Sequence, residues 1–231
     1  MKNTIINRKV IQKVANALGD LNNQVIYVGG ATVSLYCNDP AADDVRPTKD
    51  IDISIKVASL AHLEEIREEL VKKGFKQSAD LDVICRFKLD DILVDVMATK
   101  AVGWAPANPW FEEGFNNLQK IDINGTIIQI MPLTYFLASK FTAHLDRGGT
   151  DPRFSHDFED ITYILDNRTD WHKIIKEETG NVKTFLLQQL QEIKENAKLQ
   201  EAILANLYYE TQEDRFQKIM DKIDFCLEGN K

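Results

Sequence analysis

The spacing of apolar positions divides the chain near residue 131. Before that point, apolar residues recur at helical spacing over 5–18 and 59–74, and shorter β-rich runs lie around these two segments. From residue 132 onward the spacing is helical almost throughout. The predicted helices of this second part cover 133–146, 155–166, 171–208 with a break near Gly180–Asn181, and 212–227.

The first part also contains runs rich in β-branched residues, which favour strands. Asp90–Asp91 has the composition of a tight turn between two such runs, and Asn124–Gly125 is typical of a two-residue hairpin. Residues 31–36 follow a double glycine and are predicted to form the first turns of a helix. The predicted strands lie within 24–30, 50–57, 83–89 and 92–98, and in the two arms of a hairpin over 119–131.

These elements predict an α+β protein. A mixed sheet flanked by helices is expected in a first domain, residues 1–131, and a C-terminal helical domain is expected over 132–231. The length of 231 residues allows one large domain or two small ones. The change from mixed to helical periodicity places the boundary.

The composition narrows the classes of partner. The chain is 44% hydrophobic and 28% charged, as is ordinary for a globular protein with its own core. Its net charge of −8 argues against coating a nucleic-acid duplex, although a local basic patch is compatible with it. No run approaches the roughly 18 apolar residues of a membrane span, and residues 1–20 lack the features of a secretory signal. The widely spaced cysteines are expected to be reduced, so a cytoplasmic protein without membrane contact is predicted.

Two aspartates one residue apart carry the clearest chemical signal. Asp50 and Asp52 alternate with isoleucines, so in a strand both carboxylates project from one face. Asp95 lies in a second run of this kind, and pairing of the two strands would bring three carboxylates together. Such a group without a nearby cation is a site for Mg²⁺, which prefers oxygen ligands. The alternative is a salt bridge, for which the candidates are Lys49, Arg46 and Arg86.

A glycine pair precedes the aspartates. Gly29 and Gly30 follow a predicted strand and open a predicted helix. Backbone without a Cβ atom can approach a phosphate closely, and the first N–H groups of a helix can bind an anion. Glycines at strand-to-helix turns are common, so an ordinary turn is the competing interpretation.

The glycine pair, segment 46–52 and Asp95 together resemble the nucleotidyltransferase fold of the DNA polymerase β superfamily. That pattern is a glycine pair or Gly-Ser, then hydrophobic-Asp-hydrophobic-Asp, then a third acidic strand residue. Residues 137–165 are similar to the helical region of AbiEii-type nucleotidyltransferases, the toxin components of bacterial abortive-infection and toxin–antitoxin pairs. The resemblance covers residues 24–165.

The resemblance implies a nucleotidyltransferase-type sheet and roles for individual residues. Asp50 and Asp52 would bind Mg²⁺, and Asp95 would complete the site as a metal ligand or as a base near the acceptor hydroxyl. The glycine pair Gly29–Gly30 would hold the nucleoside triphosphate. The other residues placed at the nucleotide are Thr32, Lys49, Lys140 on the triphosphate, and Arg147, Asp157 and Asp160 at the junction of the two domains.

Two positions depart from the family pattern. Where the family often has Thr or Ser directly after the glycine pair, this chain has Ala31, and Thr32 comes one residue later. His156 stands where the family often has lysine, so one positive charge is missing at neutral pH. Both departures bear on whether catalysis is weakened.

Several candidate residues also have simpler interpretations. Lys140 can extend from an apolar helix face into solvent, and Arg147 can cap the end of that helix. Asp157 can stabilise the start of the next helix. The pair His156–Asp157 also resembles the His-Asp pair of metal phosphohydrolases. Further ligands for such a site would come from His144 and His172.

Aromatic residues and apolar helix faces offer two further surfaces. Trp104, Trp110 and Phe111 could stack on a nucleotide base, or they could pack against their own domain. The apolar stripes of the last helices predict packing within the protein, with a partner interface as the alternative.

The main hypothesis is therefore an enzyme. It would transfer a nucleoside monophosphate from an NTP to a hydroxyl group with Mg²⁺ and release pyrophosphate, chiefly by positioning and charge neutralisation. The acceptor could be an RNA 3′ end, a protein side chain or a small molecule, and an antitoxin protein is a possible partner. The alternative is a catalytically weak module of the same fold that binds a nucleotide or a partner.

Overall fold

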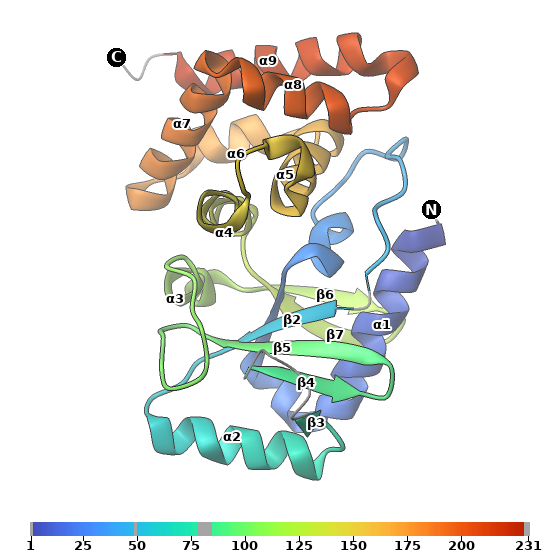
Figure 1. Cartoon of the computed structure of the whole chain (residues 1–231), viewed down its shortest axis with the longest axis vertical. Coiled ribbons are helices and arrows are strands. Elements are labelled where there is room, and N and C mark those ends of the chain that lie inside the picture. The colour runs from blue at the N-terminus through green and yellow to red at the C-terminus, as the bar shows by residue number, and fades with distance from the viewer. Residues whose placement is uncertain (1, 49, 78–84, 229–231) are drawn as a thin grey trace. The chain divides into compact units, whose positions relative to one another are not determined.

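A mixed sheet forms the centre of the first part of the chain (Figure 1). It has seven strands among the described residues, which are 2–48, 50–77 and 85–228 of the computed structural model. The strand order is β3-β4-β5-β2-β1-β7-β6. The strands are β1 (Val25–Val28), β2 (Asp50–Ile55), β3 (Lys76–Gln77), β4 (Arg86–Leu89), β5 (Ile92–Ala98), β6 (Gln119–Ile123) and β7 (Thr126–Ile130).

The chain forms two compact units. Unit 1 consists of Met1–Leu35 and Asp44–Pro132, and unit 2 consists of Tyr36–Asp43 and Leu133–Lys231. Unit 1 contains the sheet, and unit 2 is helical. The predicted α+β class is confirmed, with a mixed sheet, flanking helices and a helical C-terminal region.

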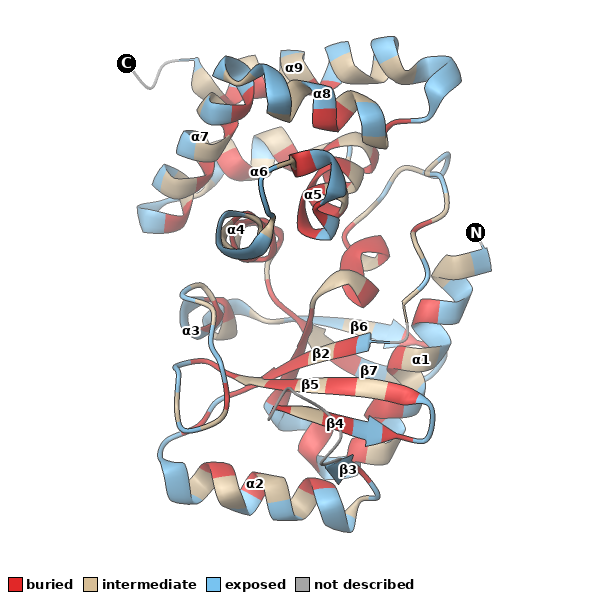
Figure 2. Cartoon of the chain, viewed as in Figure 1, coloured by how far each residue is buried: buried red, intermediate tan, exposed pale blue. Residues whose placement is uncertain are grey.

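Alternation of side chains fixes the register of the two central strands. Ile51 and Ile53 of β2 lie beside Val94 and Val96 of β5 in a parallel pair, and all four are buried. Burial of such residues contributes roughly 1.5–3 kcal/mol each relative to exposure. A shift by one residue would turn these residues to the opposite face, so the apolar row also fixes where the intervening polar residues lie. Figure 2 shows the alternation of buried and less buried positions along β5.

The helices of unit 1 follow the predicted segments. Helix α1 (Lys2–Leu18) covers the predicted 5–18, and α2 (Leu60–Lys72) starts after Ser59, whose hydroxyl accepts a hydrogen bond from the His62 amide at 3.2 Å. Gly74 follows α2 with a φ of +92°, a value that glycine adopts without strain. Leu60, the first residue of α2, is 56% exposed.

Some short elements differ from the predictions. The turn after the glycine pair is a 3₁₀ helix, η2 (Gly30–Leu35), and not the start of an α-helix. The predicted Asn-Gly hairpin is confirmed, with φ values of +52° at Asn124 and +87° at Gly125. Elements that the apolar spacing did not predict are η1 (Gly19–Gln24), the two-residue strand β3, α3 (Phe111–Gly114) and η3 (Phe115–Asn117).

Unit 2 contains the predicted helices, with one more break than expected. The segment predicted as 171–208 is three helices, because Asn196 ends one and caps the next by accepting a hydrogen bond from the Lys198 amide at 3.0 Å. The short loop before Gly180 provides the break that was expected. The helices are α4 (Leu133–Arg147), α5 (His156–Asn167), α6 (Trp171–Glu177), α7 (Gly180–Glu195), α8 (Ala197–Asn206) and α9 (Gln212–Leu227), with 3₁₀ turns η4 (Pro152–Phe154) and η5 (Tyr209–Thr211).

The segment 36–43 of the first half packs in unit 2. The Tyr36 ring stacks on Phe136 with centroids 4.2 Å apart, and the Tyr163 hydroxyl donates a hydrogen bond to the Asp43 carbonyl at 2.6 Å. The backbone amide of Asp39 donates to the Asn167 carbonyl at 3.1 Å. These contacts hold a segment without regular structure against the helices of unit 2.

In the part of the chain that the structure describes, no helix combines the length and apolarity needed to cross a bilayer.

Candidate functional site

The turn after β1 brings the glycine pair against the first carboxylates. Val28 of β1 pairs with Asp52 of β2, so the next residue, Gly29, lies beside the Asp52 side chain. Gly29 has a φ of +74°, and a Cβ atom on it would lie only 1.8 Å from Asp52 Oδ2. Glycine is therefore required here by conformation and by the close approach of the carboxylate.

Thr32 takes part in closing this turn. Its hydroxyl donates a hydrogen bond to the Gly29 carbonyl at 2.9 Å, and its amide bonds the same carbonyl at 3.3 Å. Thr32 and the preceding Ala31 are both buried. The hydroxyl that the sequence assigned to the nucleotide thus stabilises the glycine turn, and the six-residue 3₁₀ helix replaces the predicted α-helical N-terminus.

The strand register places the three aspartates on one face. Asp50 and Asp52 are two residues apart on β2, and Asp95 of β5 is directly paired with Asp52. Asp50 is exposed and the other two are partly buried, whereas the alternate residues of both strands are buried. The predicted juxtaposition of the two aspartate-bearing strands is confirmed.

Arg86 of β4 changes the electrostatics of this face. It is paired with Asp95 in the antiparallel β4–β5 ladder, and its Nε and Nη2 atoms donate to the two Asp95 oxygens, each at 2.7 Å. The hydrogen bonds and the charge of Asp95 raise the pKa of Arg86, so the guanidinium is charged at all physiological pH values. We expected three carboxylates without a local cation, and for Asp95 this expectation is wrong. Among the candidate partners Lys49, Arg46 and Arg86, it is Arg86 that forms a salt bridge with Asp95.

The donor set fits a divalent cation at two of the three carboxylates. Among the described residues there is no group of three or more His, Cys, Asp or Glu side chains arranged to hold a metal ion. Asp50 and Asp52 nevertheless offer hard oxygen donors on one face of β2, and a cation such as Mg²⁺ needs only one or two protein carboxylates when it also binds phosphate and water. Lys49, predicted at the nucleotide, lies outside the described residues.

The other predicted residues meet within unit 2. The Lys140 ammonium of α4 lies 3.0 Å from Asp157 Oδ1 and 2.6 Å from Asp160 Oδ2, both on α5. Arg147, at the end of α4, also contacts Asp157, with Nε 2.9 Å from Oδ2. The structure joins these four residues in one ion-pair cluster, which we call the α4–α5 cluster.

Burial separates the members of the α4–α5 cluster. The side chains of Lys140, Asp157 and Asp160 are 5%, 8% and 4% exposed, so the interpretation of Lys140 as a surface lysine is wrong. The Arg147 side chain is 72% exposed and binds Asp157 from the solvent side. Burial alone would raise the pKa of Asp157, but the hydrogen bonds and charges of Arg147 and Lys140 outweigh it and hold this pKa below its usual value.

The alternative sites proposed from single residues find little support. His156 is exposed and its Nδ1 lies 3.1 Å from Glu159, while His144 Nδ1 is 2.8 Å from the Ser155 hydroxyl. These contacts do not form the His-Asp metal cluster of a phosphohydrolase within the described residues. Burial lowers the pKa of His144, which favours its neutral form.

The aromatic residues of the loop before α3 are partly packed. The Trp104 indole donates to Glu64 Oε1 at 2.9 Å and lies against Phe87, with ring centroids 5.9 Å apart. Phe111 is 3% exposed. For these two residues packing within unit 1 is the better interpretation, whereas Trp110 is only partly buried.

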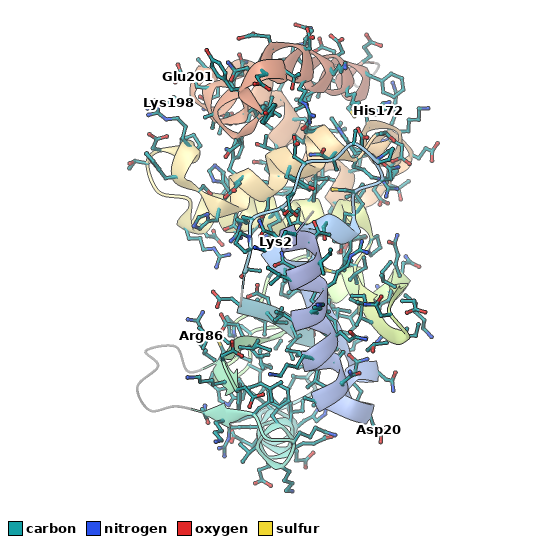
Figure 3. All side chains as sticks on the ribbon, turned by 90° about the vertical axis from the view of Figure 1, so that its right-hand side faces the viewer. Lys2, Asp20, Arg86, His172, Lys198 and Glu201 are labelled. Atoms are coloured by element: carbon teal, nitrogen blue, oxygen red, sulfur yellow. The ribbon has the colours of Figure 1, made fainter. Side chains whose placement is uncertain are left out.

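A cavity of about 350 Å³ in unit 2 contains none of the predicted site residues. Basic and acidic side chains both line it, and Arg153 pairs with Asp151 there at 2.6 Å. Lys198 and Glu201, labelled in Figure 3, belong to the same lining. No periodicity or motif could have identified it, because its residues come from a loop, a 3₁₀ turn and α8. Its lining residues are Thr150, Asp151, Arg153, Lys198 and Glu201.

Comparison with solved structures identifies the fold. A crystal structure of an antigenic nucleotidyltransferase-like protein from Paracoccidioides brasiliensis matches with a TM-score of 0.50 and 17% sequence identity, covering 87% of this chain and 93% of that one. The solution structure of the antibiotic-resistance factor ANT(2'')-Ia matches with a TM-score of 0.47 and 15% identity, covering 81% and 95%. No protein-family model and no curated protein matches the sequence.

The chain thus has a nucleotidyltransferase-like fold, as its glycine pair and alternating aspartates predicted. The structural similarity, at 17% identity, concerns the fold alone. The finer resemblance to AbiEii-type toxins stays a prediction from the sequence.

Proposed function

We propose that this protein is a nucleotidyltransferase that moves a nucleoside monophosphate from an NTP to a hydroxyl acceptor and releases pyrophosphate. One observation carries the proposal. On a nucleotidyltransferase-like fold, Asp50 and Asp52 share a face of β2, and Gly29 approaches Asp52 so closely that no larger residue fits. A structural role alone would not call for two like charges side by side on a sheet face.

In this proposal, the residues of unit 1 have separate roles at the metal ion and at the triphosphate. Asp50 and Asp52 would hold Mg²⁺, which when bound supplies positive charge against the triphosphate and the departing pyrophosphate. The exposed carboxylate of Asp50 and the half-buried one of Asp52 are accessible to such a ligand. The Gly29–Gly30 backbone would approach the triphosphate, since it carries no Cβ atom. Positioning and charge neutralisation account for most of the catalysis in this scheme.

The acceptor is an RNA end, a protein side chain or a small molecule. The net charge of −8 disfavours extended contact with RNA but leaves a local site compatible. The similarity of residues 137–165 to AbiEii-type proteins supports a toxin role with an antitoxin partner as a specific form of the proposal. A contact of Lys140 with the triphosphate belongs to that form, although two carboxylates of unit 2 already engage this ammonium.

A catalytically weak binding module is the second candidate. The Arg86–Asp95 ion pair favours it, because it neutralises the residue predicted to act on the acceptor. Ala31 favours it as well, since the hydroxyl next to the glycine pair is missing.

Transfer of α-³²P label separates the two candidates. Each of the four NTPs would be incubated with Mg²⁺, the protein and total RNA or total protein of a lysate, with a purified aminoglycoside as the small-molecule arm. The proposal predicts label in one fraction with the wild type and a loss of at least about a thousandfold, some 4 kcal/mol, in Asp50→Asn/Asp52→Asn.

The matched control is Asp20→Asn, which removes one exposed carboxylate from η1 at the far end of α1 (Figure 3). It should transfer label like the wild type. An Asp50→Asn/Asp52→Asn protein that keeps its melting temperature and still labels would refute the proposal. Nucleotide binding by the wild type without label in any arm would favour the binding module.

A further inference from the structure

Arg86 lies in a row with two of the three aspartates. The register of β4 with β5 pairs Arg86 with Asp95, and the register of β5 with β2 pairs Asp95 with Asp52. The three side chains therefore come from neighbouring positions on three adjacent strands and project from the same face of the sheet. Figure 3 marks Arg86 at the sheet of unit 1.

The contact between Arg86 and Asp95 is bidentate and partly shielded. Both Asp95 oxygens accept a hydrogen bond of 2.7 Å, and the two side chains are 25% and 17% exposed. A planar guanidinium matches a carboxylate in this fork geometry better than any other side chain. A metal ion could use Asp95 only by displacing or sharing these bonds, and it would be repelled by the fixed positive charge.

We propose that Arg86 acts as a built-in cation at Asp95, so that this site holds a single divalent cation, on Asp50 and Asp52, and none on Asp95. This inference rests on the proposed function, because it concerns how the metal site of that function is organised. Arg86 is then a positioning residue that fixes Asp95, and it contacts neither nucleotide nor acceptor. Asp95 supplies negative charge and orientation beside the site and not a third bond to the metal.

Binding of Mn²⁺ tests the stoichiometry without reference to activity. Free Mn²⁺ would be measured by electron paramagnetic resonance while the ion is titrated into the full-length protein. The wild type should bind one equivalent, and Asp50→Asn/Asp52→Asn should lose it. Arg86→Gln should gain a second equivalent or bind Mn²⁺ roughly tenfold more tightly, because removing a charge this close to a carboxylate changes ion binding by that order.

Three further variants make the result specific. Lys120→Gln removes an exposed positive charge from β6, at the opposite edge of the sheet, and should bind Mn²⁺ like the wild type. Arg86→Lys keeps the charge but not the fork, so it should gain less than Arg86→Gln. Arg86→Gln/Asp95→Asn should return to one equivalent, since the additional ligand is gone. A melting curve of each variant checks that unit 1 is folded.

The outcomes separate this inference from the proposed function. If the wild type already binds two equivalents, or if Arg86→Gln behaves like Lys120→Gln, the inference fails while the function of Asp50 and Asp52 can still hold. If Mn²⁺ binding is absent or is unchanged in Asp50→Asn/Asp52→Asn, the metal site itself fails, and the inference fails with it.

Discussion

The aspartates of unit 1 and those of the α4–α5 cluster in unit 2 differ in how their negative charge is compensated. In the α4–α5 cluster, Asp157 and Asp160 are almost fully buried and are bound by two cations of the same unit. On the sheet of unit 1, Asp50 and Asp52 are at least partly exposed, and the bidentate partner of the third aspartate is Arg86. Buried charges require partners inside the protein, whereas accessible carboxylates in a row can bind a ligand from solution.

The difference shows that residues grouped by one family resemblance can have different environments in the folded protein. The family resemblance assigned the residues of both units to one site, some to the metal or acceptor and the others to the nucleotide. The structure separates aspartates that are buried in ion pairs between helices from aspartates whose carboxylates are at least partly exposed on the sheet. The three predictions below test this separation.

The largest expected effect on stability comes from Lys140→Met. The change leaves two buried carboxylates without their shared ammonium, which should cost about 3–5 kcal/mol of the free energy of unfolding. Urea or thermal unfolding followed by circular dichroism measures it. Lys173→Met, at an exposed lysine of α6, is the matched control and should change stability by less than about 0.5 kcal/mol.

The triple variant Lys140→Met/Asp157→Asn/Asp160→Asn should recover part of the loss, since it removes the uncompensated charges. A Lys140→Met protein of wild-type stability that no longer binds NTP would contradict the comparison. It would show that Lys140 acts on the nucleotide in spite of its burial.

An intermediate effect is expected at the glycine turn of unit 1. Gly29→Ala combines a left-handed backbone with a Cβ atom 1.8 Å from Asp52, so it should cost about 2–4 kcal/mol or displace the carboxylate. Gly74→Ala is the matched control: its φ is +92° with open space around it, and it should cost only about 1 kcal/mol.

Thermal unfolding and Mn²⁺ binding together distinguish backbone strain at Gly29 from displacement of the Asp52 carboxylate. Gly74→Ala should keep the affinity for Mn²⁺, and Gly29→Ala should lose it because Asp52 is moved. Equal Mn²⁺ affinity in both variants would mean that the close approach of Gly29 has no bearing on the carboxylate site.

The sequence predicted most of the fold because apolar spacing reports burial directly. The strands β2 and β5 alternate isoleucine or valine with polar residues, which determined their faces and hence the placement of Asp50, Asp52 and Asp95. The second break in the C-terminal helices was missed because the helical spacing of Leu190, Ile193 and Ala197 continues across Asn196, and only the side-chain cap of Asn196 shows the boundary. Packing of 36–43 in unit 2 depends on tertiary contacts such as Tyr36 with Phe136, which leave no local pattern.

The candidate site was predicted less completely for a physical reason. Choosing among Lys49, Arg46 and Arg86 as partners of an aspartate requires the strand order, and β4 lies next to β5 only in the folded sheet. The burial of Lys140 likewise depends on how α4 meets α5, since its flanking apolar residues are compatible with an exposed ammonium.

The smallest effect on stability is expected for Arg147, the exposed member of the α4–α5 cluster. Because the folded-state pKa of Asp157 lies below its unfolded value of about 4, its ion pairs stabilise the protein above that pH and lose this contribution as pH falls through the folded-state pKa. Arg147→Gln should therefore lower stability by about 0.5–1 kcal/mol at pH 7, a small amount because the guanidinium is largely exposed. The difference from the wild type should vanish in acid below the pKa of Asp157. Unfolding in urea at pH 7, 5, 4, 3 and 2 measures it, with Lys173→Gln, at an exposed lysine of α6, as the control. A difference that stays constant as the pH falls would mean that Arg147 stabilises α4 through packing or the helix terminus, and that the charge of Asp157 is balanced by Lys140 alone.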